Sequence, residues 1–224
     1  MKNIIQIAGI VDDEDAQILA GNGVDYIGVP LCMNCHEDEI AHDNACQALQ
    51  KLPHSSMGVL ITYLNDADQI AELCNKLGTV IVQLHGDIEK DELKKLSSLV
   101  PNVGIMKSLI VKGDDVWELG DIIDDFSAYV DAFITDTYDH DTQASGATGK
   151  THDWEVSKKL VEISSKPIFL AGGLTPENVA DAIRMVKPAG VNCHTGVEDE
   201  KGKKDPSKVS AFIQQARAAF AEIS

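Results

Sequence analysis

Eight short runs rich in valine and isoleucine constrain the fold of this chain more than any other feature. They are IIQIAG, YIGVPL, MGVLIT, VIVQLHG, VGIMKSLIV, AFITDT, PIFLAGG and GVNCHTG. Between them lie amphipathic stretches such as 66–77, in which apolar residues recur at the spacing of a helix. Strands that are apolar throughout and alternate with helices predict a parallel sheet covered on both faces.

The number of these units favours a closed barrel. Eight strand–helix units in 224 residues, roughly 28 residues each, match the (β/α)8 or TIM barrel, which usually has about 250 residues. An open doubly wound sheet is the alternative, but it needs a glycine-rich dinucleotide turn that AGIVDD, after the first run, does not supply. No linker rich in proline or serine divides the chain. The sequence therefore predicts one α/β barrel domain over residues 1–224.

Charge and cysteine content narrow the possible partners. The chain has 19 basic and 36 acidic residues, a net charge of −17, which disfavours binding to nucleic acid and to anionic membranes. Its five cysteines are odd in number and lack the spacing of a disulfide framework. No signal peptide or long apolar span is evident. We therefore expect a cytoplasmic protein with no nucleic-acid partner and no membrane association.

Glycine-rich turns follow the last predicted strands, where barrels often build a phosphate site. LAGGLTPENV (170–179) ends a strand in two glycines, and Thr175 and Pro176 are expected to start the next helix. GVNCHTG opens a similar turn within 190–205, and SGATGK (145–150) is a third glycine-rich loop. Backbone N–H groups in such turns can approach an anion closely. A phosphorylated small molecule is the predicted ligand.

The same stretches resemble the phosphoribosylanthranilate isomerase family, a barrel of tryptophan biosynthesis. The motifs that carry the resemblance occur in order along nearly the whole chain: IAGIVDDEDA, VQLHGD, FITDT, GATGKTHDW, LAGGLTPENVADAI and GVEDEKGKKD. The resemblance implies a (β/α)8 barrel of the phosphate-binding type without a cofactor. It also implies an Amadori rearrangement of an aldose derivative to a ketose derivative, in which an acid opens the sugar ring and a base removes a proton from the adjacent carbon.

The resemblance assigns roles to several residues. Asp136 matches the general acid, although it could instead only cap a loop. Gln83 and His85 match substrate-binding groups, and His85 has an alternative reading as a structural histidine. The backbone groups that match the phosphate site belong to Gly172, Gly173, Thr195 and Gly196.

Other positions depart from the family pattern. Ala8 stands where the family has its catalytic cysteine base, and a methyl group cannot accept a proton. A gapless alignment places Glu37 on an arginine that holds the anthranilate end of the substrate. Asn192 replaces an acid, and His194 replaces a serine. Because these changes avoid the phosphate turns, we predict a phosphorylated ligand that is not phosphoribosylanthranilate.

A replacement base has three candidates. His194 is expected to point to the same side of its strand as Asn192, toward the barrel mouth, although a histidine there could simply hydrogen-bond the ligand. His36 and Glu37 are the rivals. The cluster Cys32-x-x-Cys35-His36 has spacing that suits zinc, but it lacks a second pair of ligands, so no metal is expected.

Three functions remain open at this point. The first is an isomerase acting on a phosphorylated sugar derivative. The second is a lyase, aldolase or epimerase on another phosphosugar that uses His194 or a metal. The third is a non-catalytic phosphosugar-binding protein. The family includes monomers and dimers, so a homodimer is possible.

Overall fold

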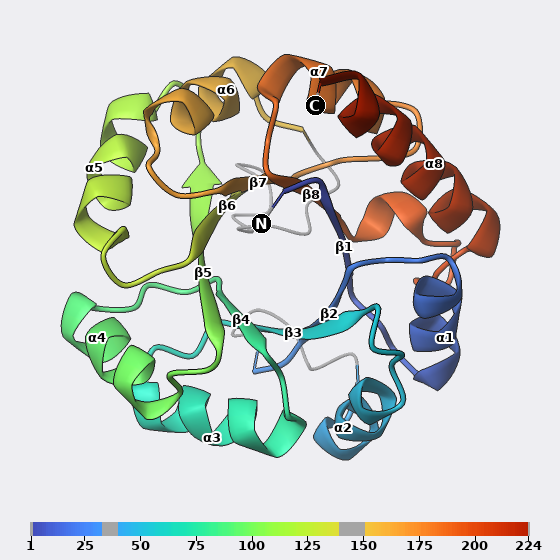
Figure 1. The fold of residues 1–224 in the computed structure, drawn as a ribbon, viewed down its shortest axis with the longest axis horizontal. Helices are drawn as coiled ribbons and strands as arrows, with labels where there is room; N and C mark the ends of the chain where they lie inside the picture. The colour runs from blue at the N-terminus through green and yellow to red at the C-terminus, as the bar shows by residue number, and fades with distance from the viewer. Residues whose placement is uncertain (1, 33–39, 139–150, 224) are drawn as a thin grey trace.

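The computed structural model describes residues 2–32, 40–138 and 151–223. Eight parallel strands form a closed barrel in chain order, with β1 paired to both β2 and β8, and helices surround it (Figure 1). This confirms the predicted (β/α)8 barrel. The strands are β1 (Ile4–Ala8), β2 (Tyr26–Pro30), β3 (Met57–Thr62), β4 (Ile81–Leu84), β5 (Gly104–Val111), β6 (Ala132–Thr137), β7 (Ile168–Leu170) and β8 (Gly190–Cys193).

The described helices follow the strands in alternation. They are α1 (Asp13–Gly21), α2 (His42–Gln50), α3 (Ala67–Leu77), α4 (Lys90–Leu99), α5 (Val116–Phe126), α6 (Trp154–Ile163), α7 (Val179–Val186) and α8 (Pro206–Ile223), with a short 3₁₀ helix η1 (Thr195–Val197) after β8. None of these helices is both long enough and apolar enough to cross a bilayer.

The strands bury side chains on both faces because alternate residues point into and out of the barrel. One apolar cluster fills the barrel interior and includes Ala8, Ile61 and Ile134, while a larger one lies between the strands and the helices. The ring of Phe169 stacks on Tyr26 with centroids 6.1 Å apart. These two layers explain why apolar residues predominate on both faces of the strands.

Helix ends largely follow the expected signals. Asp12 caps α1 by accepting a hydrogen bond from the N–H of Asp15, and Asp66 caps α3 in the same way. Gly78 ends α3 in the left-handed conformation, with φ of 66°. The polar residues at 12 and 66 therefore fix where the helices after β1 and β3 begin.

Thr175 caps the turn before α7 as expected, because its Oγ1 accepts from the N–H of Glu177 and its carbonyl oxygen accepts from the N–H of Val179, but the helix begins later than expected. Pro176 is not the first residue of the helix, which begins at Val179. A polar turn replaces the missing residues: Oδ1 of Asn178 accepts from the N–H of Thr175, and its Nδ2 donates to the carbonyl of Gly173. Asn178 thus holds the glycine turn after β7 in place before the helix begins.

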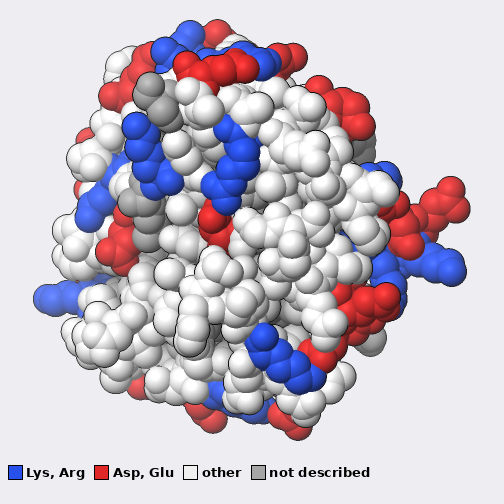
Figure 2. Space-filling model, turned by 45° about the vertical axis from the view of Figure 1, so that its right-hand side comes forward, with Lys and Arg blue, Asp and Glu red and all other residues white. Residues whose placement is uncertain are grey.

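Charged side chains are distributed around the molecule. On the face shown in Figure 2, Lys and Arg lie next to Asp and Glu at several places and do not form a broad basic area. Among the ion pairs of the structure, Arg217 donates to both carboxylate oxygens of Asp25 at 2.8 Å.

Candidate active site

A buried carboxyl group marks the end of β6. Asp136 has only 7% of its surface exposed, and its Oδ1 accepts a hydrogen bond of 2.8 Å from the N–H of Thr137. Its Oδ2 lies 3.6 Å from Nε2 of His85. Burial raises the pKa of Asp136, and the neighbouring His85 and the Thr137 N–H oppose that rise. The group therefore holds a proton at higher pH than an ordinary aspartate.

His85 joins three neighbouring strands at this point. It follows β4, its Nδ1 lies 2.6 Å from Oγ of Ser108 on β5, and its Nε2 faces Asp136 on β6. The ring of Tyr63 meets the imidazole edge-on, with centroids 5.1 Å apart. The structure thus brings together Asp136 and His85, as the sequence predicts, and adds Ser108, which the sequence analysis missed.

A polar layer lies inside the barrel. Nε2 of Gln6 donates to Oε1 of Gln83 at 2.8 Å, and Gln6 is aligned with Asn192 across β1 and β8. Among the described residues, Oε1 of Gln6 and Oδ1 of Asn192 have no hydrogen-bond partner. Buried oxygens of this kind usually accept from an ordered water or a ligand. Gln83 and Asn192 therefore both line the interior, and Gln83 is held by a partner that the sequence did not reveal.

Ala8 ends β1 inside the barrel. It is aligned with Gly28 of β2, and a Cβ atom at Gly28 would lie 2.9 Å from the Ala8 methyl group. Ala8 is 3% exposed and belongs to the interior apolar cluster. No proton acceptor exists on this side chain, so any base must come from a neighbouring element.

His194 lies beside the turn that follows Ala8. A Cβ atom at Gly9 would be 1.9 Å from Nε2 of His194, so the imidazole occupies the space that a side chain at position 9 would need. The same Nε2 lies 3.3 Å from Oε1 of Glu198. The structure thus places an imidazole–carboxylate pair against Gly9, the residue after Ala8.

A buried lysine supports this pair. Nζ of Lys204 lies 2.5 Å from Oε1 of Glu198 and 3.4 Å from the carbonyl oxygen of His194, with its side chain fully buried. The N–H of Lys204 donates to Oδ1 of Asp15, whose Oδ2 accepts from the N–H of Val11. This network ties the turns after β1 and β8 together.

The two predicted phosphate turns are adjacent. Gly172 and Gly173 have φ of 93° and 60°, which glycine adopts without strain. Gly196 approaches the β7 turn so closely that a Cβ there would lie 2.0 Å from the carbonyl oxygen of Leu174. Thr195 and Gly196 belong to η1, so the four residues predicted from the sequence form one surface of backbone at the ends of β7 and β8.

Cys193 does not point into the barrel interior. Its Sγ donates to the carbonyl of Leu174 at 3.1 Å on the outer side of the barrel wall, within the apolar layer under the helices. Burial raises its pKa to about 12. Burial likewise raises the pKa of Cys74 to about 12. Both groups remain neutral thiols near pH 7.

A cavity of about 440 Å³ opens beside His85 at the ends of β4 and β5. Its lining also includes Glu118, Leu119 and Ile122 of α5, so the cavity lies between that helix and the ends of β4 and β5, and β4 is opposite β8 in the ring of eight strands. Its wall includes Tyr63, Ser108 and Lys107. Burial lowers the pKa of Lys107, and the nearby negative charge of Asp87 opposes that shift. Space for a ligand therefore exists on the side away from the glycine turns.

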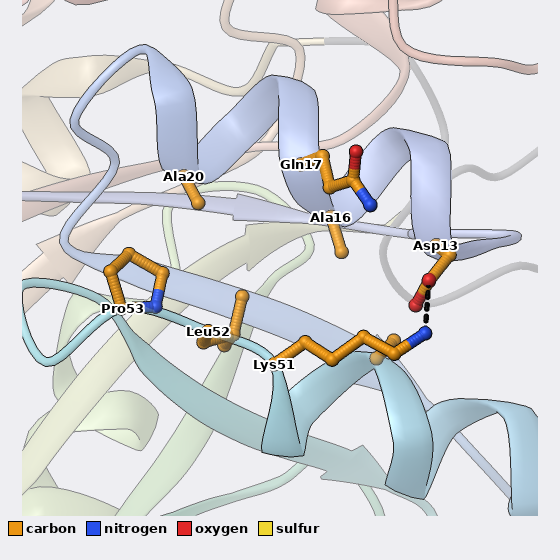
Figure 3. Close-up of a pocket in the computed structure, with 8 residues that line it drawn as sticks. Asp13, Ala16, Gln17, Ala20, Lys51, Leu52 and Pro53 are labelled. Carbon is orange, nitrogen blue, oxygen red and sulfur yellow. Dashed lines mark hydrogen bonds and ion pairs between the residues drawn. The ribbon is translucent and has the colours of Figure 1, made fainter.

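A smaller cavity of about 150 Å³ lies on the outside of the barrel between α1 and α2 (Figure 3). Alanine side chains form much of its floor, and an ion pair between Lys51 and Asp13 closes one end. It contains no group suited to proton transfer beyond these two paired residues.

Several sequence candidates fall outside the described residues. They are Glu37, His36, Cys35 and the loop 145–150. Cys32 is described, and its Sγ lies 3.9 Å from Nε2 of His42. Within the described ranges, no three His, Cys, Asp or Glu side chains lie close enough to hold a metal ion.

The fold and site define a class: a (β/α)8 barrel with a buried carboxyl group, two histidines and paired glycine turns at the ends of its strands. The sequence model of N-(5'-phosphoribosyl)anthranilate (PRA) isomerase matches residues 5–215. The chain belongs to this family, as its motifs predict.

Individual relatives can be aligned with this chain over nearly their full lengths. N-(5'-phosphoribosyl)anthranilate isomerase 2 of Methanosarcina mazei is 38% identical over 220 residues, which cover 98% of this chain and 96% of that protein. The isomerase of Aquifex aeolicus is 36% identical over 96% of this chain and 98% of its own length. The crystal structure of the Thermotoga maritima isomerase superposes with a TM-score of 0.82 at 25% identity, covering 97% of this chain and all of that one.

Proposed function

We propose that the chain converts a phosphorylated aldose derivative into the corresponding ketose derivative. The observation that carries this proposal is the buried Asp136 carboxyl at the end of β6, whose pKa burial raises. A carboxyl group that keeps its proton can donate it to the ring oxygen as the C1–O bond breaks. Membership of the PRA isomerase family supports the same reaction class.

The phosphate is proposed to bind at the turns after β7 and β8. Gly172 and Gly173 hold a left-handed turn that glycine adopts without strain, and Gly196 packs against the carbonyl of Leu174 beside that turn. The N-terminus of α7 follows the first turn, so its N–H groups favour an anion there. Backbone donors supply this site without a basic side chain.

His194 is proposed to remove the proton from C2 once the ring is open. Glu198 lies 3.3 Å from its Nε2 and stabilises the positive charge that the imidazole gains. Loss of the C2 proton gives an enaminol, which takes up a proton at C1 to become the ketose. His85, 3.6 Å from Asp136, is proposed to contact the sugar together with Gln83 and Asn192.

The end of the substrate away from the phosphate has two candidates. The names of the relatives favour anthranilate as the group attached to the sugar. Ala8 favours a different group, because the family resemblance places the base at this position and the methyl group here cannot accept a proton. In both cases the cavity beside His85 is the proposed position for that end.

The test is a panel of phosphorylated sugars and sugar–amine adducts, including PRA, screened by thermal shift and then by turnover. The proposal expects a ketose product from at least one compound, and a loss of about 10²-fold or more in rate for Asp136→Asn with phosphate-ligand binding retained. Stabilisation by phosphosugars without any product would contradict it and indicate a binding protein. Activity that a chelator abolishes would indicate a metal-dependent lyase or epimerase instead.

A further inference from the structure

A chain of side-chain hydrogen bonds runs from the candidate site into the protein. Oγ1 of Thr137 lies 2.9 Å from Nδ1 of His152, whose Nε2 lies 2.6 Å from Oγ of Ser157. Oγ of Ser157 donates to Oγ1 of Thr135 at 3.3 Å, and Thr135 donates to the carbonyl of Phe169 at 3.4 Å. The chain links β6, the segment before α6, α6 itself and β7.

The direction of these bonds fixes the tautomer of His152. Thr135 uses its only hydrogen on a carbonyl, so it accepts from Ser157, and Ser157 in turn accepts from His152. Nε2 of His152 therefore carries the proton, and Nδ1 accepts from the hydroxyl of Thr137. Burial lowers the pKa of His152 to about 4, so the ring stays neutral near pH 7.

The free end of the chain touches both halves of the candidate site. The N–H of Thr137 donates to Oδ1 of Asp136 at 2.8 Å. The hydroxyl of Thr137 lies against Gly172, where a Cβ atom would be 2.1 Å from Oγ1 and 3.2 Å from Nδ1 of His152. Thr137 therefore contacts Asp136 through its backbone N–H and the Gly172 turn through its hydroxyl group.

We propose that His152 is a positioning residue. By accepting the hydroxyl hydrogen of Thr137, it keeps the Gly172 turn in a fixed position relative to the Asp136 carboxyl group. It touches no substrate. The inference rests on the proposed function in that the turn binds the substrate phosphate and Asp136 is the acid. It adds a specific requirement, an acceptor at the position of Nδ1.

Three substitutions separate this role from a structural one. His152→Asn places an amide oxygen near the position of Nδ1 and keeps the acceptor for Thr137. His152→Gln places its amide near Nε2 and keeps only the contact to Ser157, while His152→Phe keeps ring volume and neither bond. We expect the affinity for ribose 5-phosphate, measured by calorimetry, to fall about 10-fold in His152→Gln and His152→Phe. In His152→Asn it should fall less than 3-fold.

Turnover and spectroscopy complete the test. The kcat/KM of His152→Gln and His152→Phe should fall by about 10²-fold, and that of His152→Asn by much less. Thr137→Val should show the same loss as His152→Phe. Equal losses of affinity and kcat/KM in His152→Asn and His152→Phe, or no loss in either variant, would overturn the inference. The inference would also fail if ¹⁵N shifts place the proton of wild-type His152 on Nδ1. Because the affinity ratios and the ¹⁵N shifts need no turnover, they decide the role of His152 even if the proposed reaction fails.

Discussion

Substitution of Gly9 by alanine tests the position of His194. Gly9 has φ of 77°, and its new Cβ would lie 1.9 Å from Nε2 of His194, so the imidazole must move away from Glu198. Gly23 is the matched control, because its φ is 76° and no atom lies within 4 Å of its Cβ position. Both variants share the left-handed strain of about 1–2 kcal/mol. Gly9→Ala adds an overpacking cost of about 1–3 kcal/mol.

The difference between the two variants isolates the imidazole contact. Urea unfolding should give a free energy of unfolding about 1–3 kcal/mol lower for Gly9→Ala than for Gly23→Ala, with equal m-values. Turnover should also fall in Gly9→Ala alone, because the proposed base is displaced. Equal destabilisation of the two variants, with equal activity, would refute the placement of His194 against the β1 turn.

Three further predictions concern the core, the charge network and pH. Lys204→Met removes the buried partner of Glu198 and should lower the free energy of unfolding, measured in urea, by about 3–5 kcal/mol. Lys95→Met, at an exposed ion pair, is the control and should leave the urea midpoint nearly unchanged. Phe169→Ala, in the barrel interior, should cost about 3–5 kcal/mol in the same assay. The pKa of Asp136 is raised in the folded protein, so this carboxyl group binds its proton more tightly there than in the unfolded chain. The free energy of unfolding and kcat/KM should therefore both fall as pH rises through the pKa of the folded protein. Asp136→Asn should remove the fall in stability. A flat pH profile of wild-type stability would contradict the last prediction.

The barrel could be predicted from the sequence because its signal is local and repeated. Each strand is mostly apolar, and each is separated from the next by a helical pattern, so eight independent observations point to one architecture. The start of α7 was misjudged for the opposite reason. Thr175 and Pro176 form a standard helix start, but Asn178 binds the backbone of the preceding turn, a contact that spacing alone does not reveal.

The candidate site was only partly predictable. Asp136 and the glycine turns follow from their positions at strand ends and from the family motifs. Ser108, Gln6 and Lys204 belong to the site only because the barrel brings β4, β5, β1 and β8 together, and pairing across the barrel leaves no local pattern. One signal was present: Lys107 and Ser108 interrupt the apolar run GIMKSLIV, and a polar pair in a buried strand needs an explanation.

The most direct test of the proposed reaction is to run it in D₂O and examine the products by NMR, starting with PRA and continuing through other phosphoribosylated amines. The proposed mechanism removes the C2 proton and adds one at C1, so it predicts a ketose that carries deuterium at C1. Recovered aldose labelled only at C2, products of carbon–carbon cleavage, or bound substrate without any ketose would contradict it.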